Sequence, residues 1–308
     1  MARTKVIIDN DFGGDPDGLF QLAHHVLSPS VDVMGIVNSH VLPGDPNWPC
    51  EPNSIAKGLA DAQQILDLTQ SKFDVLPGLS EFEIDHGSLK TDSTLDFLVA
   101  TIEQATSEII YCCGGPMTQL ARVIRAKAKN LEALRVIWIG GAEHNGKFPP
   151  GASSMEYNFA ADPESVQICF DAREIDLWQV PRNSYRRAVV SISELRQNLA
   201  GGNQLQRHLM QTIEDVRLRT LTNGIDTGET YCMGDSPLVL LSALENPFEP
   251  SPSDSEWLEI GRPRVSLDGA YEPSGEGVGS RTRVFDRLDT RLMFADMFAK
   301  LGGANAAF

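Results

Sequence analysis

Residues 5–18 read KVIIDNDFGGDPDG and combine a buried-strand pattern with a dense group of carboxylates. The apolar run is continuous rather than alternating, which is typical of a parallel strand covered on both faces. Four aspartates then follow within nine positions: Asp9, Asp11, Asp15 and Asp17. Like charges repel at short range and carboxylates avoid apolar cores, so this density requires solvent, a helix N-terminus or a cation.

A helix is expected directly after the aspartates, because apolar residues recur at helical spacing up to residue 27. Asp15 is the expected N-cap, and Pro16 fits the first helical position. Gly13 and Gly14 permit a tight reversal of the chain between strand and helix, which would bring the carboxylates to one point.

The same alternation of apolar runs and helical patterns continues to about residue 180. Strands are expected at 31–39, 73–78, 108–113, 134–141 and 174–180, and helices at 54–68, 93–105, 116–128 and 162–172. Such alternation predicts right-handed βαβ units. We therefore expect one α/β domain over residues 1–308, with a Rossmann-like, open, mostly parallel sheet and helices on both faces.

The C-terminal third is expected to add further helices, at 205–221, 236–244 and 290–302, and two late strands, at 257–267 and 281–288. The glycine-rich segment 273–281 precedes no helix that could present a phosphate site, so it is interpreted as a hairpin or loop.

Composition narrows the class of protein. The 308 residues carry a formal net charge of −16, which argues against non-specific binding to nucleic acid or to an anionic membrane. The five cysteines form no CxxC pair, so neither a disulfide framework nor a zinc ribbon is indicated. No apolar run is long enough to span a bilayer and no signal-peptide pattern is present, so a cytoplasmic location is expected.

The aspartates favour a metal site without proving one. Ligands of open α/β sheets bind beyond the carboxyl ends of the strands, where these residues lie. Asp15 could serve as a helix N-cap, and Asp17 could interact favourably with the helix dipole. The remaining carboxylates favour a site for Ca²⁺ or Mg²⁺. An EF-hand fails, because its fifth and twelfth positions counted from Asp9 hold Gly13 and Phe20.

Four segments together resemble one family. VIIDNDFGGDPD at 6–17 is similar to the D-x-D-P-G-x-D-D motif of the inosine-uridine-type nucleoside hydrolases. CGGPMTQLA at 113–121 resembles their T-G-P-L-T-N-x-A segment, and MGDSPLVLLSAL at 233–244 resembles H-D-P-L-A-V-A. WIGGAEHNG with EYNFAADPESVQICF, over 138–170, is similar to M-G-G-A followed by E-F-N-x-x-x-D-P-E-A. The order and distances also fit, so the resemblance covers most of the chain.

The resemblance implies one Ca²⁺ bound through residues that match the family's ligands. These are the carboxylates of Asp11, Asp17 and Asp235 and the backbone carbonyl of Gly114. Asp15 is separated from Asp17 by Pro16, which resembles a one-residue insertion, and it matches a ligand of the ribose hydroxyls. Glu156 and Asn158 match the pair that holds the sugar.

The implied activity is Ca²⁺-dependent hydrolysis of the N-glycosidic bond of a ribonucleoside, giving ribose and free base. A metal-activated water would attack the anomeric carbon, with Asp11 as general base. Asn38 and His40 end the second expected strand and are candidates for substrate binding. The family also implies a homodimer or homotetramer that acts on a small nucleoside or related riboside.

The chain departs from the family pattern at one position of chemical interest. Gly234 stands where family members often carry a histidine that protonates the leaving base. His144, Tyr231, Tyr157 and Trp48 are possible replacements. Two other interpretations stay open: a metal-dependent phosphatase of the haloacid-dehalogenase type, and a non-catalytic protein that binds Ca²⁺ and a riboside. The phosphatase pattern expects Thr or Val where Phe12 follows Asp11.

Overall fold

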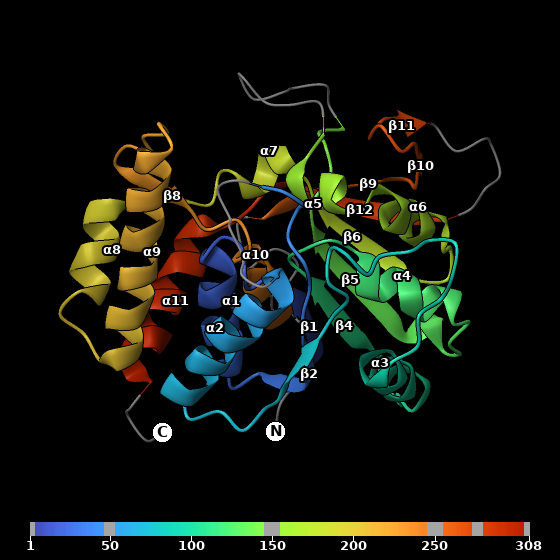
Figure 1. Cartoon of the computed structure of the whole chain (residues 1–308), viewed down its shortest axis with the longest axis horizontal. Coiled ribbons are helices and arrows are strands. Elements are labelled where there is room, and N and C mark those ends of the chain that lie inside the picture. The colour runs from blue at the N-terminus through green and yellow to red at the C-terminus, as the bar shows by residue number, and fades with distance from the viewer. Residues whose placement is uncertain (1–3, 46–52, 145–154, 245–254, 273–279, 305–308) are drawn as a thin grey trace.

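The computed structural model describes residues 4–45, 53–144, 155–244, 255–272 and 280–304. An eight-stranded sheet runs through its centre in the order β3-β2-β1-β4-β5-β6-β12-β9 (Figure 1). All neighbours in this sheet pair in parallel except β9, which lies antiparallel to β12 at the edge. The strands are β1 (Thr4–Asn10), β2 (Val31–Asn38), β3 (Val75–Pro77), β4 (Ile109–Cys113), β5 (Leu134–Ile139), β6 (Asp176–Val180), β9 (Glu256–Gly261) and β12 (Arg281–Arg287).

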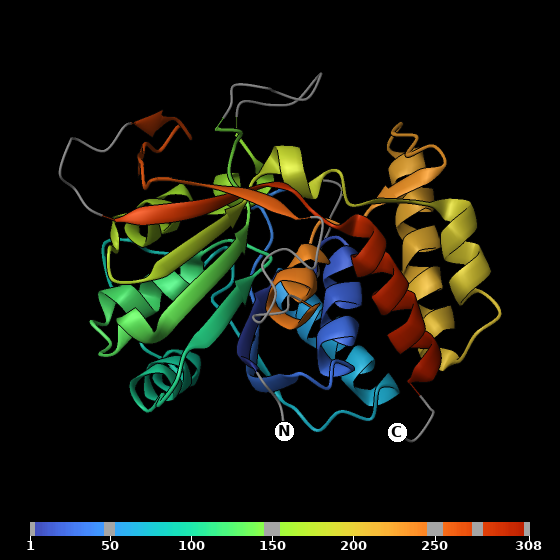
Figure 2. The ribbon, with the colours of Figure 1, turned by 180° about the vertical axis from the view of Figure 1, so that it is seen from behind.

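Helices cover both faces of the sheet, which confirms the predicted fold class (Figures 1 and 2). One face carries α1 (Asp17–Val26), α2 (Ser54–Leu68), α8 (Ile192–Leu199), α9 (Gln204–Thr222) and α11 (Thr290–Gly303). The other carries α3 (Ser93–Glu103), α4 (Thr118–Arg125) and α6 (Pro163–Asp171). Along β1 the side chains alternate between the two layers, since Val6 and Ile8 belong to the first core and Ile7 to the second.

Short elements complete the part of the chain that the structure describes. Two small antiparallel pairs join β7 (Val189–Ser191) to β8 (Thr230–Cys232) and β10 (Arg264–Val265) to β11 (Tyr271–Glu272). The short helices are α5 (Tyr157–Ala161), α7 (Arg182–Tyr185) and α10 (Pro237–Val239), with a 3-10 turn at Leu131–Ala133 and a π-helical turn at Leu240–Leu244. No helix among these residues is long and apolar enough to cross a membrane.

Two local predictions differ from the structure. The expected strand 257–267 is broken between β9 and β10, because Arg262 turns inward and donates to the carbonyls of Ala172 and Ile175 at 2.6 and 2.7 Å. The N-cap of α1 is Pro16 rather than Asp15, and it makes no side-chain cap bond. The carboxylate of Asp15 instead accepts a hydrogen bond from the Tyr231 hydroxyl. The glycine-rich segment lies outside the described residues except for Ser280 and Arg281.

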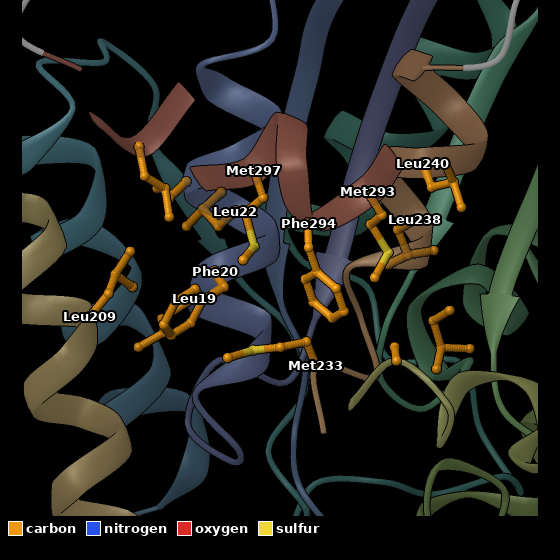
Figure 3. Packing of buried hydrophobic residues seen from close by; sticks show 14 of the residues in the cluster. Leu19, Phe20, Leu22, Leu209, Met233, Leu238, Leu240, Met293, Phe294 and Met297 are labelled. Carbon is orange, nitrogen blue, oxygen red and sulfur yellow. The ribbon is translucent and has the colours of Figure 1, made fainter. Parts of the chain in front are cut away.

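Helix α1 is the centre of the larger core. Leu19, Phe20 and Leu22 pack there with residues of α9, α11 and the 233–240 segment (Figure 3). Phe20 and Leu22 have no exposed surface, and truncating a buried phenylalanine typically costs about 3–5 kcal/mol. Met233 and Leu238 belong to the same cluster. This packing anchors the chain on both sides of residue 235 to α1, and therefore beside the aspartates that open the helix.

The strand order places the aspartates at a reversal of the sheet. From β1 the chain proceeds outward through β2 and β3, and then returns to β4 on the other side of β1. Open α/β sheets bind ligands in the crevice that such a reversal leaves beyond the carboxyl ends of the strands. Asp9 is in register with Val37 of β2 and Cys113 of β4, so the loops after β1 and β4 meet at this crevice.

Candidate functional site

A cavity of about 280 Å³ lies at the carboxyl ends of the central strands. Its wall is formed by the turn after β1, the ends of β4 and β5, helices α5 and α7, and the segment after β8. The lining residues are Asp11, Asp15, Asp17, Gly114, Ile139, Glu156, Tyr157, Asn158, Tyr185, Cys232, Gly234 and Asp235. Residues as far apart in sequence as Asp11 and Asp235, 224 positions, thus meet at one point, and seven of the nine residues expected at the site lie among them.

Two hydrogen bonds tie the aspartates to distant parts of the chain. The backbone N–H of Asp235 donates to Oδ2 of Asp17 at 3.1 Å. The Tyr231 hydroxyl donates to Oδ1 of Asp15. Asp11, Asp17 and Asp235 are all at most 9% exposed, so three largely buried carboxylates line one cavity.

Burial raises the pKa of every carboxyl in this group. The pKa of Asp235 rises to about 7 and that of Asp15 to about 6, in both cases mainly through loss of solvent. The pKa values of Asp11 and Asp17 rise well above the ordinary range, first because of burial and then because neighbouring carboxylates repel their charge. None of the described residues that line the cavity is Lys, Arg or His. The negative charge therefore lacks a cationic partner within the wall.

The donor set suits a hard cation. Three carboxylates and a backbone carbonyl are oxygen ligands of the kind that Ca²⁺ prefers. The Gly114 carbonyl accepts from Nδ2 of Asn158 at 2.8 Å, and its second lone pair remains available. Among the residues that the structure describes, no three His, Cys, Asp or Glu side chains are already arranged around one metal position. Side-chain rotation would have to complete the ligand set, so the residue types fit Ca²⁺ better than their present rotamers do.

Hydrogen bonds to backbone groups at the ends of β4 and β5 hold the side chains of Glu156 and Asn158 in place. Oε2 of Glu156 accepts from the N–H of Gly141 at 2.8 Å and caps α5 by accepting from the N–H of Phe159 at 3.1 Å. Nδ2 of Asn158 donates to the carbonyls of Gly114 and Ile139, both at 2.8 Å. Because both amide protons are used, Oδ1 of Asn158 is the atom available to a ligand.

A buried ion pair joins α7 to the segment that follows β5. The guanidinium of Arg182 binds Glu143 through two parallel bonds, Nε to Oε1 at 2.8 Å and Nη2 to Oε2 at 2.9 Å. The same short helix, α7, presents Tyr185, whose hydroxyl donates to Oε1 of Glu156 at 2.8 Å. Neither the pair nor Tyr185 was predicted from the sequence, since nothing in a tyrosine or an arginine of an irregular segment indicates which partner it will meet.

Asn38 and His40 do not line the cavity. Nδ2 of Asn38 donates to the carbonyl of Ile55 at 3.2 Å, at the start of α2. The ring of His40 contacts the Val41 carbonyl at 2.9 Å and the Thr118 hydroxyl at 3.0 Å. Both side chains are fully buried between the sheet and its loops.

The possible proton donors are dispersed. His144 stacks on Tyr271 with ring centroids 4.1 Å apart and contacts Oε1 of Gln179 at 2.8 Å, and it is not part of the cavity lining. Tyr157 lines the cavity, whereas the hydroxyl of Tyr231 is bound to Asp15. Trp48 lies outside the described residues.

Asp9 differs from the other aspartates because it faces away from the cavity. Oδ1 accepts from the Ser39 hydroxyl at 2.5 Å and Oδ2 from the Tyr111 hydroxyl at 2.6 Å. Burial raises the pKa of Asp9 to about 6 although both hydrogen bonds act in the opposite direction. Asp9 therefore links β1 to its two neighbouring strands.

Comparison with family profiles identifies one family, and several solved structures share its fold. Residues 6–270 match the sequence profile described as inosine-uridine preferring nucleoside hydrolase. Comparison with curated protein sequences gives no significant match. Among solved structures, a purine-preferring ribonucleoside hydrolase from Gardnerella vaginalis is similar, with a TM-score of 0.76, 16% identity, and coverage of 98% of this chain and 99% of the other.

Two further structures have the same fold. A plant nucleoside hydrolase matches with a TM-score of 0.73 and 18% identity, over 97% of this chain and 99% of the other. An inosine-uridine preferring nucleoside hydrolase from Bacillus anthracis matches with a TM-score of 0.68 and 16% identity, again over 97% and 99%. At this identity the structural likeness establishes the fold, and the profile match over most of the chain establishes the family. The chain belongs to the inosine-uridine preferring nucleoside hydrolases and is an N-glycosyl hydrolase.

Proposed function

We propose that this protein hydrolyses the N-glycosidic bond of a ribonucleoside in a Ca²⁺-dependent reaction, giving ribose and the free base. One observation carries the proposal: the cavity of this N-glycosyl hydrolase gathers the carboxylates of Asp11, Asp15, Asp17 and Asp235, with no cationic side chain among the described residues that line it. Cleavage of a ribosidic bond passes through a sugar with oxocarbenium character. An excess of buried negative charge stabilises that transition state and also binds a dication.

The proposed ligands of Ca²⁺ are the carboxylates of Asp11, Asp17 and Asp235 and the carbonyl of Gly114. A bound Ca²⁺ would supply Lewis acidity toward water and toward vicinal ribose hydroxyls. The backbone bond from Asp235 to Asp17 keeps two of these ligands together even though they are 218 positions apart.

Asp11 is the proposed general base. It lines the cavity where substrate would lie, and a carboxylate within reach of the attacking water can accept its proton. In the proposed step, Asp11 takes a proton from the attacking water while the water oxygen bonds to the anomeric carbon. The C–N bond breaks at the same time, and its electron pair leaves with the nucleobase.

Asp15, Glu156 and Asn158 are proposed to hold the sugar. Each lines the cavity and carries an acceptor oxygen, which suits the hydroxyl groups of ribose. Fixing the sugar in this way converts binding energy into orientation at the anomeric carbon. Family membership favours this reaction over the phosphatase alternative, and an N-glycosyl hydrolase is not a purely binding protein.

The test is release of reducing sugar from a panel of purine and pyrimidine nucleosides, with Ca²⁺ and after exhaustive chelation. We expect Asp11→Ala to lower kcat by about 10²–10⁴-fold, the usual contribution of a positioned general base. Asp32→Ala is the matched control, because Asp32 is an exposed aspartate of β2. No release by wild-type protein that holds Ca²⁺ would refute the proposal. The proposed assembly, a homodimer or homotetramer, is tested by light scattering.

A further inference from the structure

The side chain of Asn10 contacts several segments that form the cavity, although it does not line the cavity itself. Oδ1 accepts from the backbone N–H of Asp11 at 2.8 Å, and Nδ2 donates to Oδ2 of Asp235 at 3.0 Å. The amide also packs directly on two glycines. A Cβ at Gly114 would lie 2.4 Å from Nδ2, and one at Gly18 would lie 3.1 Å from the same atom. The amide of Asn10 thus hydrogen-bonds to the turn after β1 and to the segment of Asp235, and it packs against the end of β4 and the start of α1.

A chain of buried polar groups continues from Asn10 into the core. Nδ2 of Asn10 also contacts Oε1 of Gln21 at 3.2 Å, and Nε2 of Gln21 contacts Nδ1 of His25. Nε2 of His25 lies 2.9 Å from the Ser242 hydroxyl, which donates to the Leu238 carbonyl at 2.6 Å. Asn10, Gln21 and His25 have no exposed surface.

The Leu238 carbonyl can only accept, so the Ser242 hydroxyl donates to it and is free to accept from the Nε2–H of His25. Nε2 of Gln21 is an amide nitrogen and can only donate, so Nδ1 of His25 is the acceptor and Nε2 of His25 carries the proton. Burial holds the pKa of His25 well below its usual value, which agrees with the neutral ring. Gln21 must therefore present its oxygen to Asn10, and Asn10 must present its nitrogen to Asp235. The histidine fixes the orientation of the glutamine, and the glutamine oxygen together with the Asp11 N–H fixes the orientation of the asparagine amide.

The chain of polar groups ends at Leu238, in the same segment as Asp235, to which Asn10 is bonded. Leu238 lies three residues after Asp235, and its backbone N–H donates to the Asp235 carbonyl at 3.0 Å. Between Leu238 and Ser242 the backbone changes to a π-helical turn, a distortion found often near functional sites. Apolar side chains of the same size would satisfy this part of the core with no polar group to desolvate. The stability of the fold alone does not explain the polar chain.

We propose that Asn10 is a positioning residue that holds Oδ2 of Asp235 and thereby aims its other oxygen into the cavity, and that Gln21, His25 and Ser242 set the orientation of the Asn10 amide. The expected effect on Ca²⁺ binding rests on the proposed function, whereas the hydrogen bonds that orient Asp235 do not depend on it. Partners that orient the ligands of a metal typically contribute 10–100-fold to its affinity.

Gln21→Met tests the inference without touching a proposed ligand, since methionine fills nearly the same volume and removes both hydrogen bonds. His24→Met is the matched control: His24 is equally buried on α1, but it binds Asp296 at 2.7 Å, away from the chain. Ca²⁺ affinity is measured by calorimetry, and folding by urea unfolding. We expect Gln21→Met to weaken Ca²⁺ binding about 10–100-fold and to lower kcat. His24→Met should lower stability while leaving Ca²⁺ affinity unchanged.

A milder variant and a second readout separate this inference from the proposed function. Ser242→Ala removes the partner of His25 and the donor to the Leu238 carbonyl but leaves Gln21 and Asn10 in place, and we expect a smaller loss of Ca²⁺ affinity in the same direction. Crystal structures of wild type and Gln21→Met need neither metal nor turnover, and the bond from Asn10 to Asp235 should be lost in the variant. Retention of that bond, or unchanged Ca²⁺ affinity in Gln21→Met, would overturn the inference. Wild-type protein that releases no ribose would refute the proposed function instead.

Discussion

The ring of Tyr185 occupies the space that a side chain at residue 234 would need. A Cβ added to Gly234 would lie 3.2 Å from Cδ2 of Tyr185 and 3.2 Å from Oδ2 of Asp17, closer than ordinary van der Waals contact. The glycine therefore allows the phenol ring to cross this side of the cavity. In a chain with a larger residue at this position, Tyr185 could not occupy its present place.

Gly234→Ala should lower kcat/KM by about tenfold or more, because the new methyl group displaces Asp17 or the Tyr185 ring by a few tenths of an ångström. Gly201→Ala is the matched control, since a Cβ there meets nothing within 4 Å. Steady-state kinetics of both variants provide the measurement. Equal kcat/KM in Gly234→Ala and wild type would show that the close approach has no catalytic consequence.

Tyr185→Phe removes the hydrogen bond to Glu156 and keeps the ring. If Glu156 binds the sugar, KM should rise about five- to tenfold with a smaller change in kcat, as expected for one hydrogen bond to a carboxylate. Tyr271→Phe is a suitable control, because the hydroxyl of Tyr271 is bonded to Gln179 at 2.7 Å, outside the cavity lining. A variant whose KM matches wild type would separate Tyr185 from sugar binding.

Turnover should depend strongly on the leaving group. Burial and nearby carboxylates raise the pKa values of the Tyr185 and Tyr231 hydroxyls, so both are poor proton donors. A general acid typically contributes about 10²–10⁴-fold, and a nitrophenolate leaves without one. We expect 4-nitrophenyl riboside to exceed inosine in kcat/KM by about 100-fold or more. Similar values for the two substrates would reveal an acid that the described residues do not identify.

Ca²⁺ affinity should rise with pH between about 5.5 and 8. Burial raises the pKa of Asp235 to about 7, and Asp11 and Asp17 are shifted in the same direction. A carboxyl must lose its proton before it can bind a cation, so protons compete with Ca²⁺ below these pKa values. Calorimetry in buffers of different ionisation enthalpy would detect proton release on binding. Affinity that does not change over this range would contradict the proposed ligand set.

As pH rises from about 4 to 8, the free energy of unfolding of wild type should fall relative to that of Asp9→Asn. The pKa of Asp9 is raised from 3.8 to about 6 in the folded protein, so the folded state binds the proton more tightly than the unfolded state does. The stabilisation is fully present below about 4 and is lost as pH rises through about 6. Two pKa units correspond to about 3 kcal/mol. Urea unfolding of both proteins across this range gives the difference directly.

The sheet was predictable because its central strands are buried on both faces. The apolar runs that became β1 and β4 are continuous, and a helical pattern follows each of them. The antiparallel edge strand β9 is largely exposed, with Leu258 63% exposed, and its extent could not be read from hydrophobicity. The inward turn of Arg262 depends on carbonyls of a distant segment, which a local pattern does not contain.

The cavity could be predicted only where its residues fall in segments that resemble a family. Asp11, Asp17, Glu156 and Asp235 come from such segments, and the structure brings them together. Asn38 was expected at the site only because it ends a strand, and that position does not specify which face its side chain takes. In the structure Asn38 faces Gly58 of α2, where a Cβ would approach its Oδ1 to 2.0 Å.

Because β1 lies in the middle of the sheet, the cavity should unfold only together with the whole domain. This strand is paired along its length with β2 and with β4, so Asn10 and Asp11 emerge from the most enclosed backbone of the molecule. Amide protons in such strands exchange with solvent only when the whole domain opens. The turn that carries the aspartates should therefore remain protected until global unfolding. Heat or urea would then abolish activity and the native fold in a single transition, with no earlier loosening of the cavity.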